Sequence, residues 1–318
     1  VLTAHPTQFY PGSVLGIITD LSKAINDNNL IEIKKLLSQL GKTPFFKKKK
    51  PSPFDEAVSL TWYLENVFYN SISNIQKYIK SNIADFDFKN SDLVSLGFWP
   101  GGDRDGNPYV TNEITIKTAQ KLRSDIIKNY YRDVSKLRRR LTFKNIEEVI
   151  IDIENRLYKS FNQNTDQTSI SLDEFKEKLN FIKVEVSQHH ESLYMDEIND
   201  LIDKINIFGY HFASLDIRQD SSIHNDVFEK ILFQLFDKKT SRNYKNLSDD
   251  EKIMFIKSKK LTNNTLNFTD SQVLSTLGSI NAMRSIQKSN GEKGCHRYII
   301  SHNQSALNIL EVHKMFEI

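Results

Sequence analysis

Four short apolar segments, separated by long stretches with helical spacing, constrain the fold of this 318-residue chain most strongly. Each segment is rich in β-branched or aromatic residues and is followed by a cluster of polar or charged residues, as is typical of a strand that leads into a functional loop. The segments are residues 1–5, 92–99, 211–217 and 295–300. Strands that alternate with helices indicate a parallel sheet, and polar clusters after every strand indicate a barrel or a doubly wound sheet with one active face.

The intervals between these strands are much longer than a minimal strand–helix–strand unit requires. Apolar residues recur through them at three- and four-residue steps, which predicts helices. The best-marked helix begins near Ser52, which can cap it, with Pro53 suited to the first position and Asp55 to the positive helix end. Further helices are expected at residues 13–25, 33–40, 111–140, 146–161, 172–189, 195–207, 225–236, 273–286 and 306–316, the last capped by Asn303. The chain is therefore expected to be mostly α.

Composition excludes several classes of protein. The 43 basic and 40 acidic residues leave a net charge of +3, so no global field favours a nucleic-acid partner. No apolar run reaches the length of a membrane span, so no membrane partner is expected. The single cysteine, Cys295, excludes an internal disulfide framework and fits a reducing, cytoplasmic location. Both ends fall inside patterned segments, which favours a piece of a longer protein.

Two kinds of metal site can be considered and rejected. A calcium loop over residues 103–107 would need glycine at its sixth and glutamate at its twelfth position, where the chain has Pro108 and Ile114. The glycines of this stretch instead suit a tight turn whose charged residues pair with each other or with neighbours. A histidine site from His5, His302 and the 189–190 pair lacks any ligand spacing typical of zinc, and adjacent histidines point to different faces of a helix.

An anion site fits the strand ends better. Arg104 and Arg218 follow or end two of the apolar segments, and His5 ends a third. Arginine binds phosphate or carboxylate through two parallel hydrogen bonds, and a neutral histidine can move a proton at neutral pH. Asp216 falls on the same strand face as Arg218 because side chains alternate with a period of two.

Five stretches of the chain resemble the phosphoenolpyruvate carboxylase family, and they come in the family's order. They are VLTAHPTQ (1–8), PSPFDEA (51–57), FWPGGDRDGNPYVT (98–111), FGYHFASLDIRQDS (208–221) and RYIISHNQSALNILEV (297–312). The resemblance implies an (α/β) barrel embedded in many helices. The expected fold is therefore mostly α with a parallel β component, a partial (β/α)8 or TIM barrel of about four strands within large helical insertions, forming a single incomplete region over residues 1–318.

The resemblance also implies a lyase that carboxylates phosphoenolpyruvate with bicarbonate to oxaloacetate and phosphate. This is anaplerotic carbon dioxide fixation for the tricarboxylic acid cycle, and it uses Mg²⁺ or Mn²⁺. The family's essential histidine falls on His5, with a proposed role as base toward carboxyphosphate. The family's substrate arginine falls on Arg218, and Trp99 falls where a tryptophan helps to wall the substrate pocket. With Arg104 from the anion interpretation, these are the expected site residues of a protein that is a homotetramer at full length.

Two departures from the family pattern matter. Pro11 stands where the family usually has a basic residue, three places after the histidine motif. The motifs of the family's C-terminal half, including its metal-binding carboxylates, do not occur in the chain. The metal is therefore expected to be bound mainly by residues outside it, and the fragment alone is expected to be inactive. The alternative is a non-catalytic helical binding or scaffold protein that has kept the family's fold.

Overall fold

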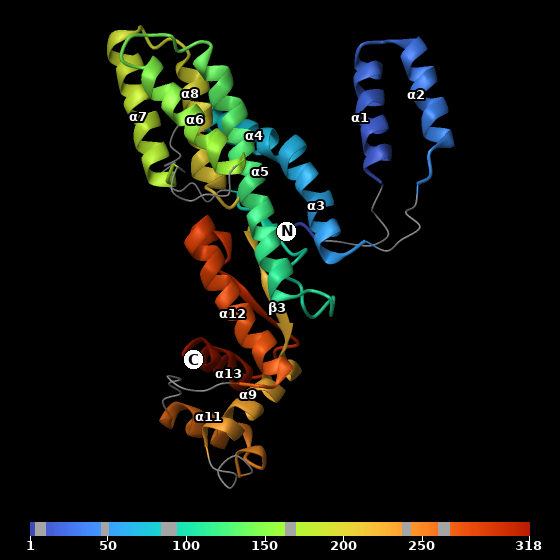
Figure 1. The fold of residues 1–318 in the computed structure, drawn as a ribbon, viewed down its shortest axis with the longest axis vertical. Coiled ribbons are helices and arrows are strands. Elements are labelled where there is room, and N and C mark those ends of the chain that lie inside the picture. The colour runs from blue at the N-terminus through green and yellow to red at the C-terminus, as the bar shows by residue number, and fades with distance from the viewer. Residues whose placement is uncertain (4–10, 46–50, 84–93, 163–169, 237–242, 260–267) are drawn as a thin grey trace.

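The computed structural model describes residues 1–3, 11–45, 51–83, 94–162, 170–236, 243–259 and 268–318 (Figure 1). His5 lies outside these described residues, as do residues 4 and 6–8 of its motif. No helix in this part of the chain is long and apolar enough to cross a membrane. The fold is mostly helical with a few short parallel strands, as predicted.

The first two helices, α1 (Gly12–Asn26) and α2 (Leu30–Lys42), form a hairpin with a small core of its own (Figure 1). Pro11 occupies the N-cap position of α1, which suits a residue with no N–H to donate. Asn29 caps α2 through its side chain, which accepts a hydrogen bond from the backbone N–H of Glu32 at 3.2 Å.

The helix predicted from Ser52 is confirmed together with its cap. Ser52 accepts a hydrogen bond from the N–H of Asp55 at 3.2 Å, and the Asp55 carboxylate accepts one from the N–H of Ser52 at 3.0 Å. The helix is not uniform, however. It runs through α3 (Pro53–Tyr63), the π-helical segment η2 (Leu64–Phe68) and α4 (Tyr69–Asn82).

A bundle of helices lies at one end of the molecule in Figure 1. It consists of α5 (Asn112–Arg138), α6 (Glu147–Asn162), α7 (Leu172–His189) and α8 (Met195–Phe208), with α4 against it. Tyr130, Phe175 and Phe208 are fully buried in its core, and the hydroxyl of Tyr130 donates to the carbonyl of Gly209 at 2.7 Å. Burial of such large side chains drives the bundle together.

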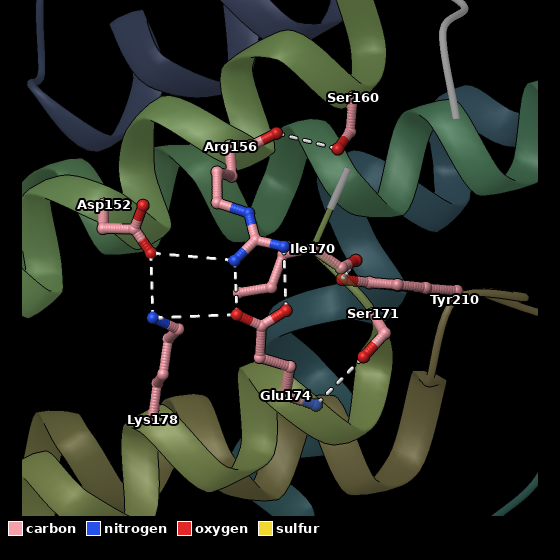
Figure 2. A network of polar contacts seen from close by, with 8 residues as sticks. All are labelled: Asp152, Arg156, Ser160, Ile170, Ser171, Glu174, Lys178 and Tyr210. Carbon is pink, nitrogen blue, oxygen red and sulfur yellow. Dashed lines mark hydrogen bonds and ion pairs between the residues drawn. The ribbon is translucent and has the colours of Figure 1, made fainter. Parts of the chain in front are cut away.

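A network of ion pairs joins α6 to α7 on the bundle surface (Figure 2). Arg156 donates to both carboxylate oxygens of Glu174, and Lys178 pairs with Asp152 at 2.9 Å. Beside it Tyr210 donates to the carbonyl of Ile170 at 2.9 Å. Two cations therefore meet two anions across the two helices.

The strands pair in parallel and in chain order. Leu2 bridges to Phe98 in β1 (Gly97–Phe98), and β1 pairs with β2 (Ser214–Leu215). After one residue the chain continues as β3 (Ile217–Asp220), which pairs with β4 (Tyr298–Ser301). Three of the four strand segments have other boundaries than expected. In the described residues the second is a strand only at Gly97–Phe98, and the third begins at Ser214 and is interrupted at Asp216. The third strand continues through Asp220, and the fourth begins at Tyr298 because a 3-10 turn at Glu292–Gly294 precedes it.

The remaining helices are α9 (Ser221–Leu235), α11 (Asp249–Ser258), α12 (Ser271–Asn290) and α13 (Ala306–Phe316), and residues from all four form a second core. The expectation that Asn303 caps the last helix was wrong. Ser305 is its N-cap residue, and no side-chain cap hydrogen bond forms there. The strands lie between this group and the bundle (Figure 1).

Candidate functional site

The candidate site is built on the turn at residues 99–106, which follows β1 and forms a parallel bridge to β3 between Asp103 and Arg218. Gly102 accepts a hydrogen bond from the N–H of Arg218 at 2.9 Å, and the N–H of Arg104 donates to the carbonyl of Arg218 at 3.0 Å. A Cβ on Gly102 would lie 2.1 Å from the carbonyl oxygen of Asp216. Only glycine permits this close approach, so the glycines predicted to form a tight turn also fasten that turn to β3.

Arg218 lies at the centre of the site. Its guanidinium carbon is 3.9 Å from the centre of the Trp99 ring, and its two terminal nitrogens are each 3.3 Å from a carboxylate oxygen of Asp103 or Asp105. A flat cation is thus held between an indole face and two acids. The structure brings together Trp99 and Arg218, two of the residues named from the sequence.

Trp99 is fixed in turn by a buried carboxylate. Its indole N–H donates to Asp216 at 3.0 Å, and the other oxygen of Asp216 accepts from Arg297 at 2.8 Å. Asp216 is 2% exposed, so its charge depends on these two partners. Asp216 lies between β2 and β3, and the prediction that it shares a strand face with Arg218 stays a prediction. Arg297 was missed as a neighbour of the site, because it comes from a strand eighty residues away whose pairing sets the contact.

The two acids beside Arg218 are crowded. Burial, and then the neighbouring Asp105 carboxylate, raise the pKa of Asp103 to about 7. Three polar atoms here have no hydrogen-bond partner among the described residues: the Nε of Arg218 and one carboxylate oxygen each of Asp103 and Asp105. Buried polar atoms are normally satisfied, so the cluster has unused capacity to bind a polar ligand.

The side chain of Arg104 makes its hydrogen bonds to other elements than the Arg218 guanidinium does. Its side chain donates to Asn112 at the start of α5 and to Ser275 in α12. Burial lowers the pKa of its guanidinium. Arg104 therefore ties the turn to two helices, and its part in binding substrate stays a prediction.

The histidines considered from the sequence are scattered. His302 is exposed and hydrogen-bonds through Nδ1 to Asp220 at 2.5 Å. His190 stacks on Phe143 with ring centres 4.6 Å apart. In the parts of the chain that the structure describes, no group of three or more potential ligands is placed to hold a metal ion.

Comparison with known proteins identifies the family. The model of the phosphoenolpyruvate carboxylase family matches residues 1–171 and 153–317. The chain belongs to this family. It is 24% identical to the phosphoenolpyruvate carboxylase of Prochlorococcus marinus (strain MIT 9312) and 24% identical to that of Nitrosomonas eutropha. Each alignment covers 98% of this chain and 39% of the relative, so the chain spans about two fifths of the length of these carboxylases.

Membership of the family gives the candidate site its context. The five stretches that suggested the family are spread over the chain, and the matched region covers nearly all of it. Trp99 and Arg218 come from two different stretches, yet they are in contact. The structure therefore brings residues from two of these five stretches into contact.

Proposed function

We propose that this chain is the N-terminal-to-middle part of a phosphoenolpyruvate carboxylase, which converts phosphoenolpyruvate and bicarbonate to oxaloacetate and phosphate. The observation that carries the proposal is the Arg218 guanidinium of β3, held against Trp99, which directly follows β1. A delocalised cation on an aromatic wall suits the phosphate and carboxylate groups of such a substrate.

We propose that the paired strands are the first half of a (β/α)8 barrel. Leu2 lies parallel beside β1, β1 beside β2, and β3, which continues β2 after one residue, beside β4. This is the strand order that a barrel requires. The second half would close the barrel and cover the open edges.

The residues would divide the work as follows. Arg218 binds the phosphate of phosphoenolpyruvate, and Trp99 walls the pocket. His5, which follows the strand segment paired with β1, acts as base toward carboxyphosphate. Arg104, on the turn after β1, adds positive charge to the site. Its side chain is held there by hydrogen bonds to Asn112 and Ser275. Enclosure of this end would keep carbon dioxide away from water until the enolate captures it.

The divalent metal of the family, Mg²⁺ or Mn²⁺, would stabilise the charge that develops on the enolate. The described residues of this chain do not fit such an ion. The two carboxylates nearest the site, Asp103 and Asp105, both pair with Arg218. The metal ligands are therefore expected outside this chain. A cytoplasmic homotetramer is the expected form of the full-length protein.

The proposal is tested by oxaloacetate formation in a coupled assay with malate dehydrogenase. The full-length protein should form oxaloacetate, and residues 1–318 alone should form none, because the metal ligands are missing. Oxaloacetate formation by the fragment alone would contradict the division of the site. An inactive full-length protein would favour the non-catalytic scaffold.

His5→Asn separates the role of the histidine from that of the rest of the site. In the full-length protein this variant should lose carboxylation while some phosphate release remains, since the base acts after bicarbonate attack. Phosphate release and oxaloacetate formation are measured in parallel. Normal turnover by His5→Asn would show that the assigned role is wrong.

A further inference from the structure

The two carboxylates at the site pair with the same Arg218 nitrogens that an anionic ligand would need. Asp103 lies 3.3 Å from one terminal nitrogen of Arg218, and Asp105 lies 3.3 Å from the other. A phosphate or carboxylate binds arginine through these two nitrogens. An anion that reaches Arg218 must therefore share the guanidinium with two carboxylates or displace them.

The cluster also carries one negative charge too many. Two acids face one cation, whereas the surface network of α6 and α7 has two cations for two anions (Figure 2). One oxygen of Asp103 and one of Asp105 lack any hydrogen-bond partner in the described part of the chain. An excess charge in a partly buried cluster is costly, and a proton is the simplest way to remove it.

The neighbouring charges leave Asp103 as the group that takes the proton. On its own turn it faces Asp105 and the backbone N–H of Gly106, and from β3 it faces Arg218. The other charged groups of these strands are already paired. Asp216 pairs with Arg297, and Asp220 at the end of β3 pairs with His302, which follows β4. The side chain of Arg104 bonds to α5 and α12.

We propose that binding of an anion at Arg218 is coupled to proton uptake, and that the Asp103–Asp105 pair holds the proton. This inference rests on the proposed function, because it concerns the same site. A carboxylate oxygen of Asp103 gains a proton from solvent, the pair becomes singly charged, and the ligand anion takes the guanidinium hydrogen bonds that are released. No covalent bond to the ligand forms.

The sign of the pH dependence follows directly. An incoming anion adds negative charge beside Asp103, so its pKa is higher in the complex than in the free protein. Below the free-state pKa, which lies near 7, Asp103 is already protonated and the affinity is greatest. As pH rises between the free and bound pKa values, the affinity falls by up to about tenfold per pH unit.

The experiment measures anion binding to the full-length protein between pH 7 and pH 9. Sulfate serves as a probe that does not titrate in this range, and phosphoenolpyruvate is titrated above the second pKa of a phosphate monoester, about 6. Isothermal titration calorimetry gives the affinity for each anion at each pH. Calorimetry in buffers of different ionisation enthalpy then counts the protons taken up per ligand bound.

The parent protein should take up protons on binding, and its affinity should fall about fivefold between pH 7 and pH 8. Asp103→Asn keeps the size of the side chain but cannot be charged. It should take up no proton and bind with the same affinity across the range, about tenfold more tightly than the parent at pH 8. Asp105→Asn should move the fall in affinity to lower pH without abolishing it, because burial, the larger cause, still raises the pKa of Asp103.

Two control variants isolate the pair. Glu113→Gln removes an exposed acid from the nearby first turn of α5 and should leave the slope unchanged. His302→Gln removes the partner of Asp220 at the end of β3 and should also leave the slope unchanged. Loss of the slope in His302→Gln would overturn the proposal. Weaker binding by Asp103→Asn at every pH would also overturn it, since that is the result expected if Asp103 only orients Arg218.

The result is separable from the test of the proposed function. Oxaloacetate formation with identical pH slopes in the parent and in Asp103→Asn would reject proton coupling and leave the carboxylase intact. Proton-coupled sulfate binding without any oxaloacetate formation would reject the carboxylase and leave the coupling intact.

Discussion

Two groups of charged residues in this molecule look alike in composition but differ in balance. The network between α6 and α7 joins Arg156 and Lys178 to Asp152 and Glu174, and each charge has an opposite partner (Figure 2). The cluster at the strand ends joins the single cation Arg218 to two acids, and three of its polar atoms have no hydrogen-bond partner in the described structure. Charge balance therefore distinguishes a cluster of charged residues that joins two helices from one that can accept a ligand.

The largest expected effect comes from removing the cation of the unbalanced cluster. Arg218→Gln in the full-length protein should lower kcat/KM for phosphoenolpyruvate by a factor of about 10²–10³, the usual cost of losing one donor to a developing charge. Steady-state kinetics of oxaloacetate formation measure this. Arg156→Gln removes the same charge from the balanced network and should leave kcat/KM unchanged. Equal losses in both variants would end the distinction between the two groups.

The next effect tests the backbone that holds the cluster. Gly102→Ala would place a methyl group 2.1 Å from the Asp216 carbonyl oxygen, so the turn must move away from β3. We expect the free energy of unfolding to fall by about 3 kcal/mol, within the range of severe strain or overpacking. Urea denaturation measures it. Gly16→Ala in α1, where nothing lies within 4 Å of the new Cβ, should not destabilise the protein. An unchanged stability in Gly102→Ala would show that the close approach is not required.

Much of this fold follows from local pattern. The Ser52 cap and the helices after it were predicted because apolar spacing and capping residues act within a few positions of each other. The parallel strands were predicted because they alternate with helices. The π-helical segment at 64–68 was not, since it replaces α-helical hydrogen bonds without changing the apolar pattern.

The site was predictable in its members but not in its contacts. Arg218 and Trp99 were named from motifs, and Asp216 from its strand face. The continuation of the third strand through Asp220 was missed because Arg218 and Gln219 are polar, and a strand with polar side chains does not stand out as an apolar run. The pairing of Arg297 with Asp216 was also missed, because it depends on β4 lying beside β3.

Glu311 is a buried acid away from the Arg218 cluster, and it tests whether an unsatisfied acid by itself marks a functional site. It is fully buried, accepts from Tyr244 at 3.2 Å, and its second oxygen has no hydrogen-bond partner in the described residues. Burial raises the pKa of Glu311 to about 7. Its folded-state pKa exceeds the unfolded value, so the stability it contributes is fully present below about pH 4.5 and is lost as pH rises to 7.

Glu311→Gln should therefore be more stable than the parent at pH 8, by about 2 kcal/mol, and nearly equal to it at pH 4.5. Urea denaturation at both pH values measures this, with the exposed Glu317→Gln as control. Carboxylase activity of the full-length protein should not change. A loss of activity would mean that Glu311 also contributes to function. Charge imbalance beside Arg218 would then no longer distinguish the ligand site from other buried acids. An unchanged pH dependence of stability would show that Glu311 is not strained by burial.

The smallest effect is expected where the charges are balanced. Arg156 donates to both oxygens of Glu174, and this hydrogen bonding lowers the pKa of Glu174. The folded-state pKa is depressed, so the stability from this pair is present above the unfolded pKa and is lost as pH falls through the folded one. Both side chains are partly exposed to solvent, so Arg156→Gln should cost only about 0.5–1 kcal/mol at neutral pH, and less at high salt. Urea denaturation at low and high salt measures the cost, and Lys159→Gln, which removes an exposed cation from the same helix, serves as control. A cost several times larger and insensitive to salt would contradict this prediction. It would mean that the α6–α7 network behaves as a buried group, although its charges are balanced and partly exposed.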